Sequence, residues 1–363
     1  MTSALLDRRQ PQVLRFWAMP FPPNPHDHSV LTTGALTLAQ ITDIFKRAES
    51  YRESFGKNGS FQSAPDSASK KSAITSQSFE SPIVSLLFFE PSTRTRMSFE
   101  IAALRLGYRV QIMDSASTTS LTKGESLTDT VINVLAMRPD ALVIRYGKSM
   151  ELDRLLPTLQ LPVLNAGSGV VSHPSQALLD AWTIRQNLHE VSGQKVLIVG
   201  DIRHSRVANS NFDLLLRLGA EVAVCGPKEF LPLASELPTG VKIFEELDEA
   251  VAWATVYMAL RIQLERHVDE PAKNATGASK SRMNQKLNHG PDLDLPDFHA
   301  QFGLSPRRLK ILRKDAIILH PGPINHGVEL SDEAIHDSRA RILNQVENGV
   351  YIRAALLARA LEV

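Results

Sequence analysis

The stretch that decides the fold is IVSLLFFEPSTRTRMSFEIAALRLGYRVQIM, residues Ile83–Met113. It begins with an apolar run typical of a buried strand, Ile83–Phe89, and continues with a segment of helical periodicity, Met97–Leu106. Gly107 marks the expected end of that helix, because glycine commonly follows the last helical turn. A second strand-like run, Tyr108–Met113, comes next. The stretch therefore predicts a strand–turn–helix–strand unit whose turn is the hexapeptide PSTRTR.

The hexapeptide, residues 91–96, places hydroxyl and guanidinium groups at the start of the predicted helix. The first turn of a helix has backbone N–H groups without intrahelical partners and the positive end of the dipole, and both attract anions. Ser92, Thr93 and Thr95 add hydroxyl donors, and Arg94 adds a planar guanidinium suited to phosphate oxygens. A single serine or threonine here would indicate an ordinary helix cap. Three hydroxyls beside two arginines instead favour an anion site.

The composition is that of a globular protein of about two domains, because 363 residues exceed one typical core. The 40 basic and 39 acidic residues nearly cancel, so neither nucleic acid nor an anionic membrane is the expected partner. The only cysteine, Cys225, lies in an apolar run, and we expect it to be buried. No stretch is apolar enough to span a bilayer and residues 1–30 show no secretory pattern, so we expect a cytoplasmic protein.

Short apolar runs alternate with helical segments along the rest of the chain, a pattern typical of parallel sheets with helices on both faces. A long helical segment, Ser175–Leu188, is placed to bridge two such sheets, and a last helix is expected at Gly349–Leu361. An early amphipathic helix is expected at about residues 37–51, and the polar residues 56–78 and 271–296 predict loops. The other expected strands are 141–144, 162–164, 195–199, 221–224, 255–260 and 316–319.

Polar residues follow the ends of several of these strands. In open parallel sheets, ligands bind at the carboxyl ends of the strands, so these residues are the site candidates. An arginine after a strand is commonly a solvated terminus, and its place at the ligand-binding edge is what favours a functional role. Besides PSTRTR, the candidates are Arg145, the turn Gly167–Gln176, Arg206, Arg261–Gln263 and His320–Asn325.

Five motifs together resemble the carbamoyltransferase family. PSTRTR resembles its STRTR phosphate turn, and HPSQALLD, beginning at His173, resembles its HPTQALLD motif. The segment Ser120–Ser126 resembles the beginning of its KGETLxDT loop. HPGP from His320 and the string RIQLER from Arg261 resemble members that use aspartate as the acceptor, not ornithine. The resemblance covers residues 83 to about 355, together with the early amphipathic helix.

The resemblance implies transfer of the carbamoyl group of carbamoyl phosphate to the amine of L-aspartate, in pyrimidine biosynthesis. The catalytic residues that it implies are Arg94, Thr95, Arg145 and His173. The residues that it implies for carbamoyl phosphate binding are Ser92, Thr93, Arg94, Thr95, Arg145, His173, Gln176, Pro321, Gly322 and Pro323. Those implied for aspartate binding are Lys123, Arg206, Arg261 and Gln263.

These residue types suit the implied chemistry. Carbamoyl transfer passes through a tetrahedral species whose oxygen gains negative charge, and His173, Thr95 and the arginines are available donors to it. The Gln176 amide oxygen and the backbone carbonyls of His320–Pro323 can accept from the carbamoyl NH2. The attacking amine comes from the substrate, so no covalent nucleophile is needed. We expect no cofactor, and no metal, because no His/Cys cluster has metal-ligand spacing.

The fold expected from pattern and resemblance together is α/β, with two doubly wound parallel-sheet domains joined by helices and a C-terminal helix that packs back on the first domain. We place the boundaries as follows: an extended arm at residues 1–30, a carbamoyl phosphate domain at 31–174, an aspartate domain at 175–340 and the returning helix at 341–363. One departure from the family is His326, at a position where arginine is usual, so no role is carried over to it.

The resemblance also implies a homotrimer, or a multiple of trimers, in which Ser120 and Lys123 reach the site of a neighbouring subunit. Some members work in assemblies with dihydroorotase or with regulatory subunits, which would be further partners. Three other functions stay open at this point: transfer to another amine such as ornithine, a non-catalytic scaffold, and a dehydrogenase. The last is disfavoured because Gly200, which follows the expected strand 195–199, does not begin a G-x-G-x-x-G pattern.

Overall fold

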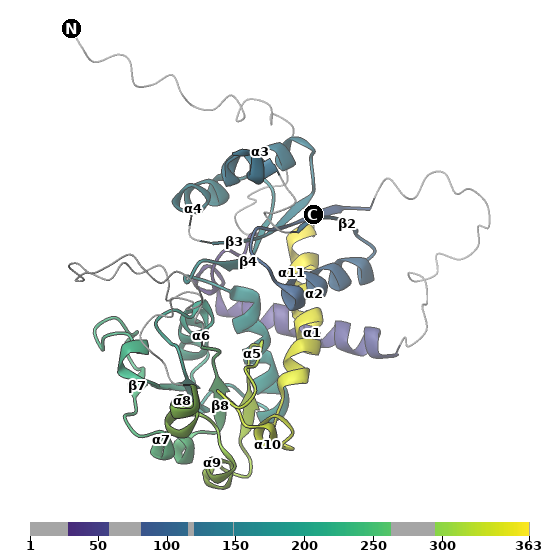
Figure 1. Cartoon of the computed structure of the whole chain (residues 1–363). Coiled ribbons are helices and arrows are strands. Elements are labelled where there is room, and N and C mark those ends of the chain that lie inside the picture. Colours follow the sequence, from purple (N-terminus) through teal and green to yellow (C-terminus); the bar gives the residue numbers. More distant parts are fainter. Residues whose placement is uncertain (1–27, 58–80, 115–119, 148, 263–294, 363) are drawn as a thin grey trace, which may run out of the picture.

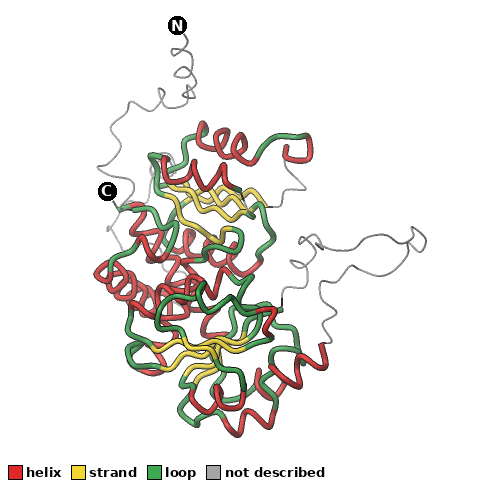
Figure 2. Tube along the Cα trace, turned by 90° about the vertical axis from the view of Figure 1, so that its left-hand side faces the viewer, coloured by secondary structure: helices red, strands yellow, loops and turns green. Residues whose placement is uncertain are grey.

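The computed structural model describes residues 28–57, 81–114, 120–147, 149–262 and 295–362. Two parallel sheets lie one above the other, with helices between them and on their outer faces (Figures 1 and 2). This arrangement confirms the predicted α/β class with two parallel-sheet units.

The first sheet has four parallel strands in the order β2-β1-β3-β4. The inner strand β1 alternates its apolar side chains between two cores. Leu86 and Phe88 face a core shared with the helices between the sheets, and Leu87 faces a core under the outer helices α3 and α4. The strand–turn–helix–strand unit of the sequence is therefore present in its predicted order. The strands of the first sheet are β1 (Ile83–Phe88), β2 (Arg109–Asp114), β3 (Ala141–Tyr146) and β4 (Val163–Ser168).

The second sheet has five parallel strands in the order β7-β6-β5-β8-β9. Ile198 and Met258 face the same central core as the first sheet, whereas Leu197 and Tyr257 face an outer core. Cys225 is buried in that outer core, as predicted. The strands are β5 (Lys195–Val199), β6 (Glu221–Cys225), β7 (Lys242–Ile243), β8 (Val256–Ala259) and β9 (Ile317–Leu319).

Two helices link the sheets and close the central core. The bridging helix α5 (Pro174–Leu188) runs between them, and the last helix α11 (Ile342–Leu361) packs on α1, α2 and α5 (Figure 1). The C-terminal helix thus returns to the first sheet's helices, as predicted, although it begins well before Gly349. The other helices are α1 (Leu38–Lys57), α2 (Thr93–Arg105), α3 (Leu127–Ala136), α4 (Met150–Leu155), α6 (Arg206–Arg217), α7 (Leu247–Trp253), α8 (Leu295–Phe302), α9 (Pro306–Ile311) and α10 (Asp332–Ile335). Short 3-10 helices are η3 (Thr33–Ala35), η5 (Ser120–Lys123), η6 (Leu156–Thr158) and η7 (Lys228–Phe230).

Parts of three expected segments lie outside the described residues: residues 1–27 of the arm, residues 58–78 of the first expected loop and residues 271–294 of the second. Where the arm reaches the described part, Val30 is buried and forms an isolated bridge to Leu164 of β4. The domain boundaries stay a prediction. Among the described helices, none is both long and apolar enough to cross a bilayer.

Candidate active site

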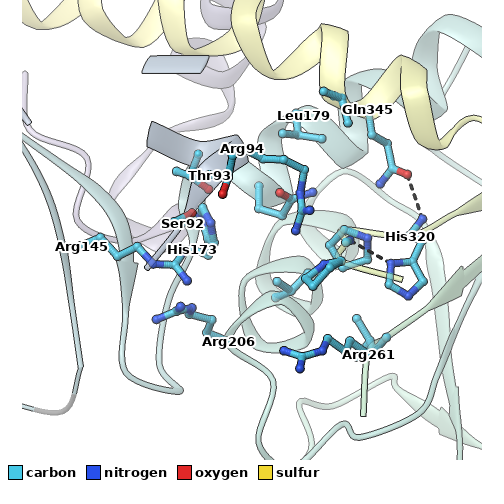
Figure 3. A pocket seen from close by; sticks show the side chains of 18 of the residues that line it. Ser92, Thr93, Arg94, Arg145, His173, Leu179, Arg206, Arg261, His320 and Gln345 are labelled. Atoms are coloured by element: carbon cyan, nitrogen blue, oxygen red, sulfur yellow. Dashed lines mark hydrogen bonds between the residues drawn. The ribbon is translucent and has the colours of Figure 1, made fainter. Parts of the chain in front are cut away.

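A cavity of about 680 Å³ opens between the two sheets, at the carboxyl ends of their strands. The strand register explains why distant residues meet there. Phe88 of β1 pairs with Arg145 of β3, so the turn after β1 starts beside that arginine. In the second sheet, β5 lies beside β8 and β8 beside β9, which groups the segments that follow them. The predicted residues that line the cavity are Ser92, Thr93, Arg94, Thr95, Arg145, His173, Gln176, Arg206, Arg261, Pro321, Gly322 and Pro323 (Figure 3).

The first turn of α2 forms one wall of this cavity. Ser92 is the N-cap residue, and its hydroxyl accepts no capping hydrogen bond from the helix. The N–H groups of the first helical turn have no carbonyl partner within the helix, so they add to the hydroxyls as donors toward the cavity. Thr93 is exposed and Thr95 is buried at the same wall. This end of α2 therefore has the anion-binding geometry that the sequence predicts.

Arg94 extends from this turn toward the second sheet and lies against Gly322. A Cβ atom added at Gly322 would be only 2.7 Å from Cζ of Arg94 and 2.9 Å from its Nη2. Gly322 also has a φ of +69°, which disfavours other residues. Partial burial lowers the pKa of Arg94, and the nearby charge of Arg261 lowers it further. Two cations so close together favour a site for a multiply charged anion.

Arg145 and Arg206 approach each other on the opposite side of the cavity and share the carboxylate of Glu90. Nη1 of Arg206 donates to Oε2 of Glu90 at 2.9 Å and to the carbonyl of Gly169 at 3.0 Å, while Nε of Arg145 is 3.6 Å from the same carboxylate oxygen. Both guanidiniums pack on Gly167, where a Cβ would lie 3.1 Å from Arg206 and 3.4 Å from Arg145. Gly167 and Glu90 thus fix where the two arginines lie.

Two buried histidines face the cavity as neutral donors or acceptors. His173 precedes α5, and its Nδ1 has no hydrogen-bond partner among the described residues. Burial, and then the charges of Arg145, Arg206 and Arg353, hold the pKa of His173 well below its usual range. Nδ1 of His320 accepts the backbone N–H of Gly322 at 2.8 Å, so its proton sits on Nε2, which is buried and has no partner within the part of the chain that the structure describes. Burial, Arg94 and Arg261 lower the pKa of His320 to about 3.

We expect both histidines to stay uncharged across the range where an exposed histidine, with a pKa of about 6.5, gains its proton. Unfolding frees them to take up protons below that value, so they contribute to a loss of stability as the pH falls through it. Ring chemical shifts of His173 and His320 should therefore stay flat from about pH 8 to pH 5 in the folded protein, and titrate in urea. A folded-state titration midpoint near the usual value would contradict this geometry.

Several residues that line the cavity are absent from the sequence prediction. Glu90 stands directly before the hexapeptide but lies at a strand end, where a carboxylate is commonly solvated. Gln345 and Arg353 come from α11, far away in the sequence. Arg353 is buried on the apolar face of that helix beside Phe99, and burial lowers its pKa to about 9. A charged residue among apolar helical positions was the available signal.

Not every residue predicted for the site is placed at this cavity. Lys123 is exposed in η5 and is not among the lining residues, and Ser120 begins the same 3-10 helix. Gln263 lies outside the described residues. His326, where the family has arginine, is exposed and its Nδ1 is 3.1 Å from Asp332. Over the described ranges, no three His, Cys, Asp or Glu side chains gather in a way that could hold a metal ion.

Both halves of the chain match sequence models of the same protein family. Residues 28–186 match the sequence model of the aspartate/ornithine carbamoyltransferase carbamoyl-P binding domain, and residues 192–360 match that of the Asp/Orn binding domain. The chain is 46% identical over 271 residues to an aspartate carbamoyltransferase catalytic subunit of Geotalea daltonii, covering 75% of this chain and 80% of that one. It is 40% identical over 332 residues to the aspartate carbamoyltransferase catalytic subunit of Syntrophotalea carbinolica, covering 92% of this chain and 94% of that one.

Solved structures of aspartate transcarbamoylase from Trypanosoma cruzi are similar over nearly the whole fold. The structure in complex with N-(phosphonacetyl)-L-aspartic acid has a TM-score of 0.71 and 27% identity, covering 92% of this chain and 96% of that one. The complex with carbamoyl phosphate and aspartate has a TM-score of 0.70 and 27% identity, with coverage of 92% and 97%. By its two matched domains and these relatives, the chain belongs to the aspartate/ornithine carbamoyltransferase family.

Proposed function

We propose that the chain transfers the carbamoyl group of carbamoyl phosphate to the amine of L-aspartate, yielding N-carbamoyl-L-aspartate and phosphate for pyrimidine biosynthesis. One observation carries this proposal: besides the buried Arg353, four guanidiniums from distant parts of the chain line a single small cavity beside the start of α2. They are those of Arg94, Arg145, Arg206 and Arg261 (Figure 3). One phosphate and two carboxylates need that much positive charge.

The phosphate binds at the start of α2 in this proposal. The N–H groups of the first turn and the hydroxyls of Ser92, Thr93 and Thr95 donate to its oxygens. Arg94 and Arg145 neutralise its charge and, as planar guanidiniums, fix its orientation. The same contacts become stronger as the phosphate leaves with its full charge, which is the condition for lowering the barrier.

The carbamoyl group then points toward His173 and the turn 320–323. Because His173 is neutral, it can donate one hydrogen bond to the carbonyl oxygen without adding a charge that would compete for the phosphate. Thr95 and the arginines are the other donors to the tetrahedral oxyanion. The amide oxygen of Gln176 and the carbonyls of Pro321, Gly322 and Pro323 accept from the carbamoyl NH2.

Aspartate binds on the side of the second sheet, where Arg206 and Arg261 take its two carboxylates with help from Gln263 and Lys123. Only one nitrogen of Arg206 is bonded to Glu90, and a guanidinium has five N–H donors, so donors remain for a carboxylate. The uncharged substrate amine attacks the carbamoyl carbon, the C–O bond to phosphate breaks, and the departing phosphate takes the amine proton. No residue of the chain is bonded covalently.

The test is an assay of purified protein with labelled carbamoyl phosphate and a panel of amines. Carbamoylaspartate should form, and ornithine should give no product. Reaction with another amine and not with aspartate would assign a different acceptor. No product with any amine would favour a non-catalytic scaffold, and binding of a nicotinamide cofactor measured by calorimetry would indicate a dehydrogenase.

The assembly that this function implies is a homotrimer, or a multiple of trimers, in the cytoplasm. The further partners included in the proposal are dihydroorotase or regulatory subunits. The proposal includes the domain boundaries given above. One observation within the single chain supports the trimer: Lys123 is exposed and does not line the cavity of its own chain. In the assembled protein, Ser120 and Lys123 of one subunit would complete the site of the next.

This shared site predicts complementation between two inactive variants. Arg94→Ala and Lys123→Ala each disable a site, but a mixed trimer contains sites that have both native residues, one from each chain. Mixing the variants after mild dissociation should restore a fraction of the activity, while each variant alone stays inactive. Mixtures that exchange subunits, as seen by mass, without gaining activity would place Lys123 outside the neighbour's site.

A further inference from the structure

A carboxylate behind the cavity wall, that of Asp180 in α5, is the centre of a buried chain of hydrogen bonds. Its Oδ1 accepts from Nε2 of Gln176 and from Nε2 of Gln345, each at 2.8 Å. Its Oδ2 accepts from Nδ2 of Asn211 at 2.9 Å. Asp180 has no exposed surface. Amides from α5, α11 and α6 thus share one carboxylate, and Arg353 of α11 is the charged side chain that acts on it.

The hydrogen bond at the His320 end of this network determines which groups donate and which accept along it. The backbone N–H of His320 can only donate, and it donates to Oε1 of Gln345 at 2.8 Å (dashed in Figure 3). Gln345 must therefore turn its Nε2 toward Asp180, and Asp180 must accept. Because the same Oδ1 also accepts from Gln176, the amide oxygen of Gln176 has to point away from Asp180.

Gln176 lines the cavity, so the group that it offers to a ligand there is an acceptor. We propose that Asp180 is a positioning residue: it holds the Gln176 amide oxygen toward the carbamoyl NH2 and thereby selects carbamoyl phosphate over acyl phosphates that lack this donor. The inference rests on the proposed function, since it assigns the ligand's amide to this part of the cavity. A free glutamine would present oxygen or NH2 equally well.

The charge state of Asp180 is what makes the arrangement one-directional. Burial raises the pKa of Asp180 to about 6, while the bonds from Asn211, Gln345 and Gln176 and the charge of Arg353 lower it. At neutral pH the carboxylate is therefore ionised and only accepts. Once protonated it can also donate, and Gln176 is then free to turn its NH2 group toward the ligand.

The test compares carbamoyl phosphate with acetyl phosphate, which has the same phosphate and a methyl group in place of the NH2. Asp180→Asn keeps the size of the side chain and introduces a donor. We expect the KM for carbamoyl phosphate to rise about ten- to hundredfold, since a buried hydrogen bond is lost. The inhibition constant of acetyl phosphate should change by less than about twofold, because a methyl group forms no such bond.

A matched control lies in the same interface between α5 and α11. Asn348 is buried, and its Nδ2 donates to Thr183 at 2.8 Å and to Gln186 at 2.7 Å, away from the cavity. Asn348→Asp makes the reverse amide–carboxylate exchange and should lower stability without changing the ratio of the two constants. The proposal would be overturned if Asp180→Asn left the ratio of the KM for carbamoyl phosphate to the inhibition constant of acetyl phosphate unchanged, whether both ligands bind as before or both bind equally more weakly.

The wild-type protein provides a second arm if Asp180→Asn does not fold. Lowering the pH through the pKa of Asp180 should weaken carbamoyl phosphate relative to acetyl phosphate, and titration of the phosphate and of cavity residues that both ligands share largely cancels in the ratio. A ratio that stays constant would contradict the inference. A wild-type chain that binds carbamoyl phosphate with this preference but forms no carbamoylaspartate would instead disprove only the proposed function.

Discussion

Replacing Arg94 by alanine is expected to reduce kcat/KM about a thousandfold or more, because the proposed mechanism gives this one side chain both phosphate binding and stabilisation of transition-state charge. The guanidinium lies between the start of α2 and Gly322, and Arg261 is close enough to lower its pKa. Its removal leaves the leaving phosphate with fewer donors at the moment its charge develops. Initial rates of carbamoylaspartate formation at varied carbamoyl phosphate measure the effect. Arg94→Lys should recover part of it, since the charge returns without the planar guanidinium.

The same hexapeptide provides the control. Arg96 follows two residues later, but its Nε is 3.1 Å from Asp114 and its Nη1 is 3.6 Å from Glu100, and it does not line the cavity. Arg96→Ala should keep kcat/KM within a few-fold of the wild type. Equal losses in both variants would mean that the motif matters for folding, and near-normal turnover of Arg94→Ala would remove Arg94 from the mechanism.

The second large effect is expected from Gly322→Ala, although glycine has no side chain that could contact a substrate. The added methyl would lie 2.7 Å from Cζ and 3.0 Å from Nε of Arg94, so the guanidinium must move. A displacement of about 1 Å in a positioning group can cost about a hundredfold in rate, and we expect a loss of that order. Steady-state kinetics and a crystal structure of the variant would show both the loss and the displaced side chain.

Gly327→Ala separates this displacement from simple backbone strain. Gly327 has a φ of +72°, close to the +69° of Gly322, but a Cβ there would meet nothing within 4 Å. Both substitutions should therefore cost a similar conformational energy, about 1–2 kcal/mol of stability. Only Gly322→Ala should lose activity. Matching activity losses at equal melting temperatures would contradict the role given to the contact with Arg94.

Much of the fold and the site is predictable from local sequence. Apolar runs of strand length and Gly107 after a helical segment identify elements whose order the structure confirms. Arg145, Arg206 and Arg261 each follow or end a strand, and the carboxyl ends of parallel strands share one edge. Their convergence on a single cavity follows from that rule, even though they are far apart in the sequence.

The residues that sequence reasoning missed are those whose surroundings come from other elements. Asp180 looks like one polar position in an amphipathic helix, and only the packing of α6 and α11 around it makes it the centre of a buried network. Glu90 becomes a partner of two arginines only when β3 and α6 are in place. Such contacts depend on tertiary packing that local periodicity does not encode.

The start of the last helix illustrates the same limit. The helical spacing of Ile352, Leu356 and Leu357 predicts a last helix that starts at Gly349. In the structure α11 already begins at Ile342 and continues through that glycine. A Cβ at Gly349 would lie 2.3 Å from Nη1 of Arg353, so the buried arginine occupies the space that a larger residue would need. Glycine is required there by a side chain, not by a break in the helix.

The central claim is that one cavity holds phosphate at the start of α2 and both aspartate carboxylates on arginines of the second sheet. A crystal structure of this chain with N-(phosphonacetyl)-L-aspartate tests it most directly, because the compound joins both charged ends in one molecule. The account predicts the phosphonate at Ser92–Thr95 with Arg94, and the carboxylates on Arg206 and Arg261. A ligand bound elsewhere, or bound here with its carboxylates away from both arginines, would contradict it.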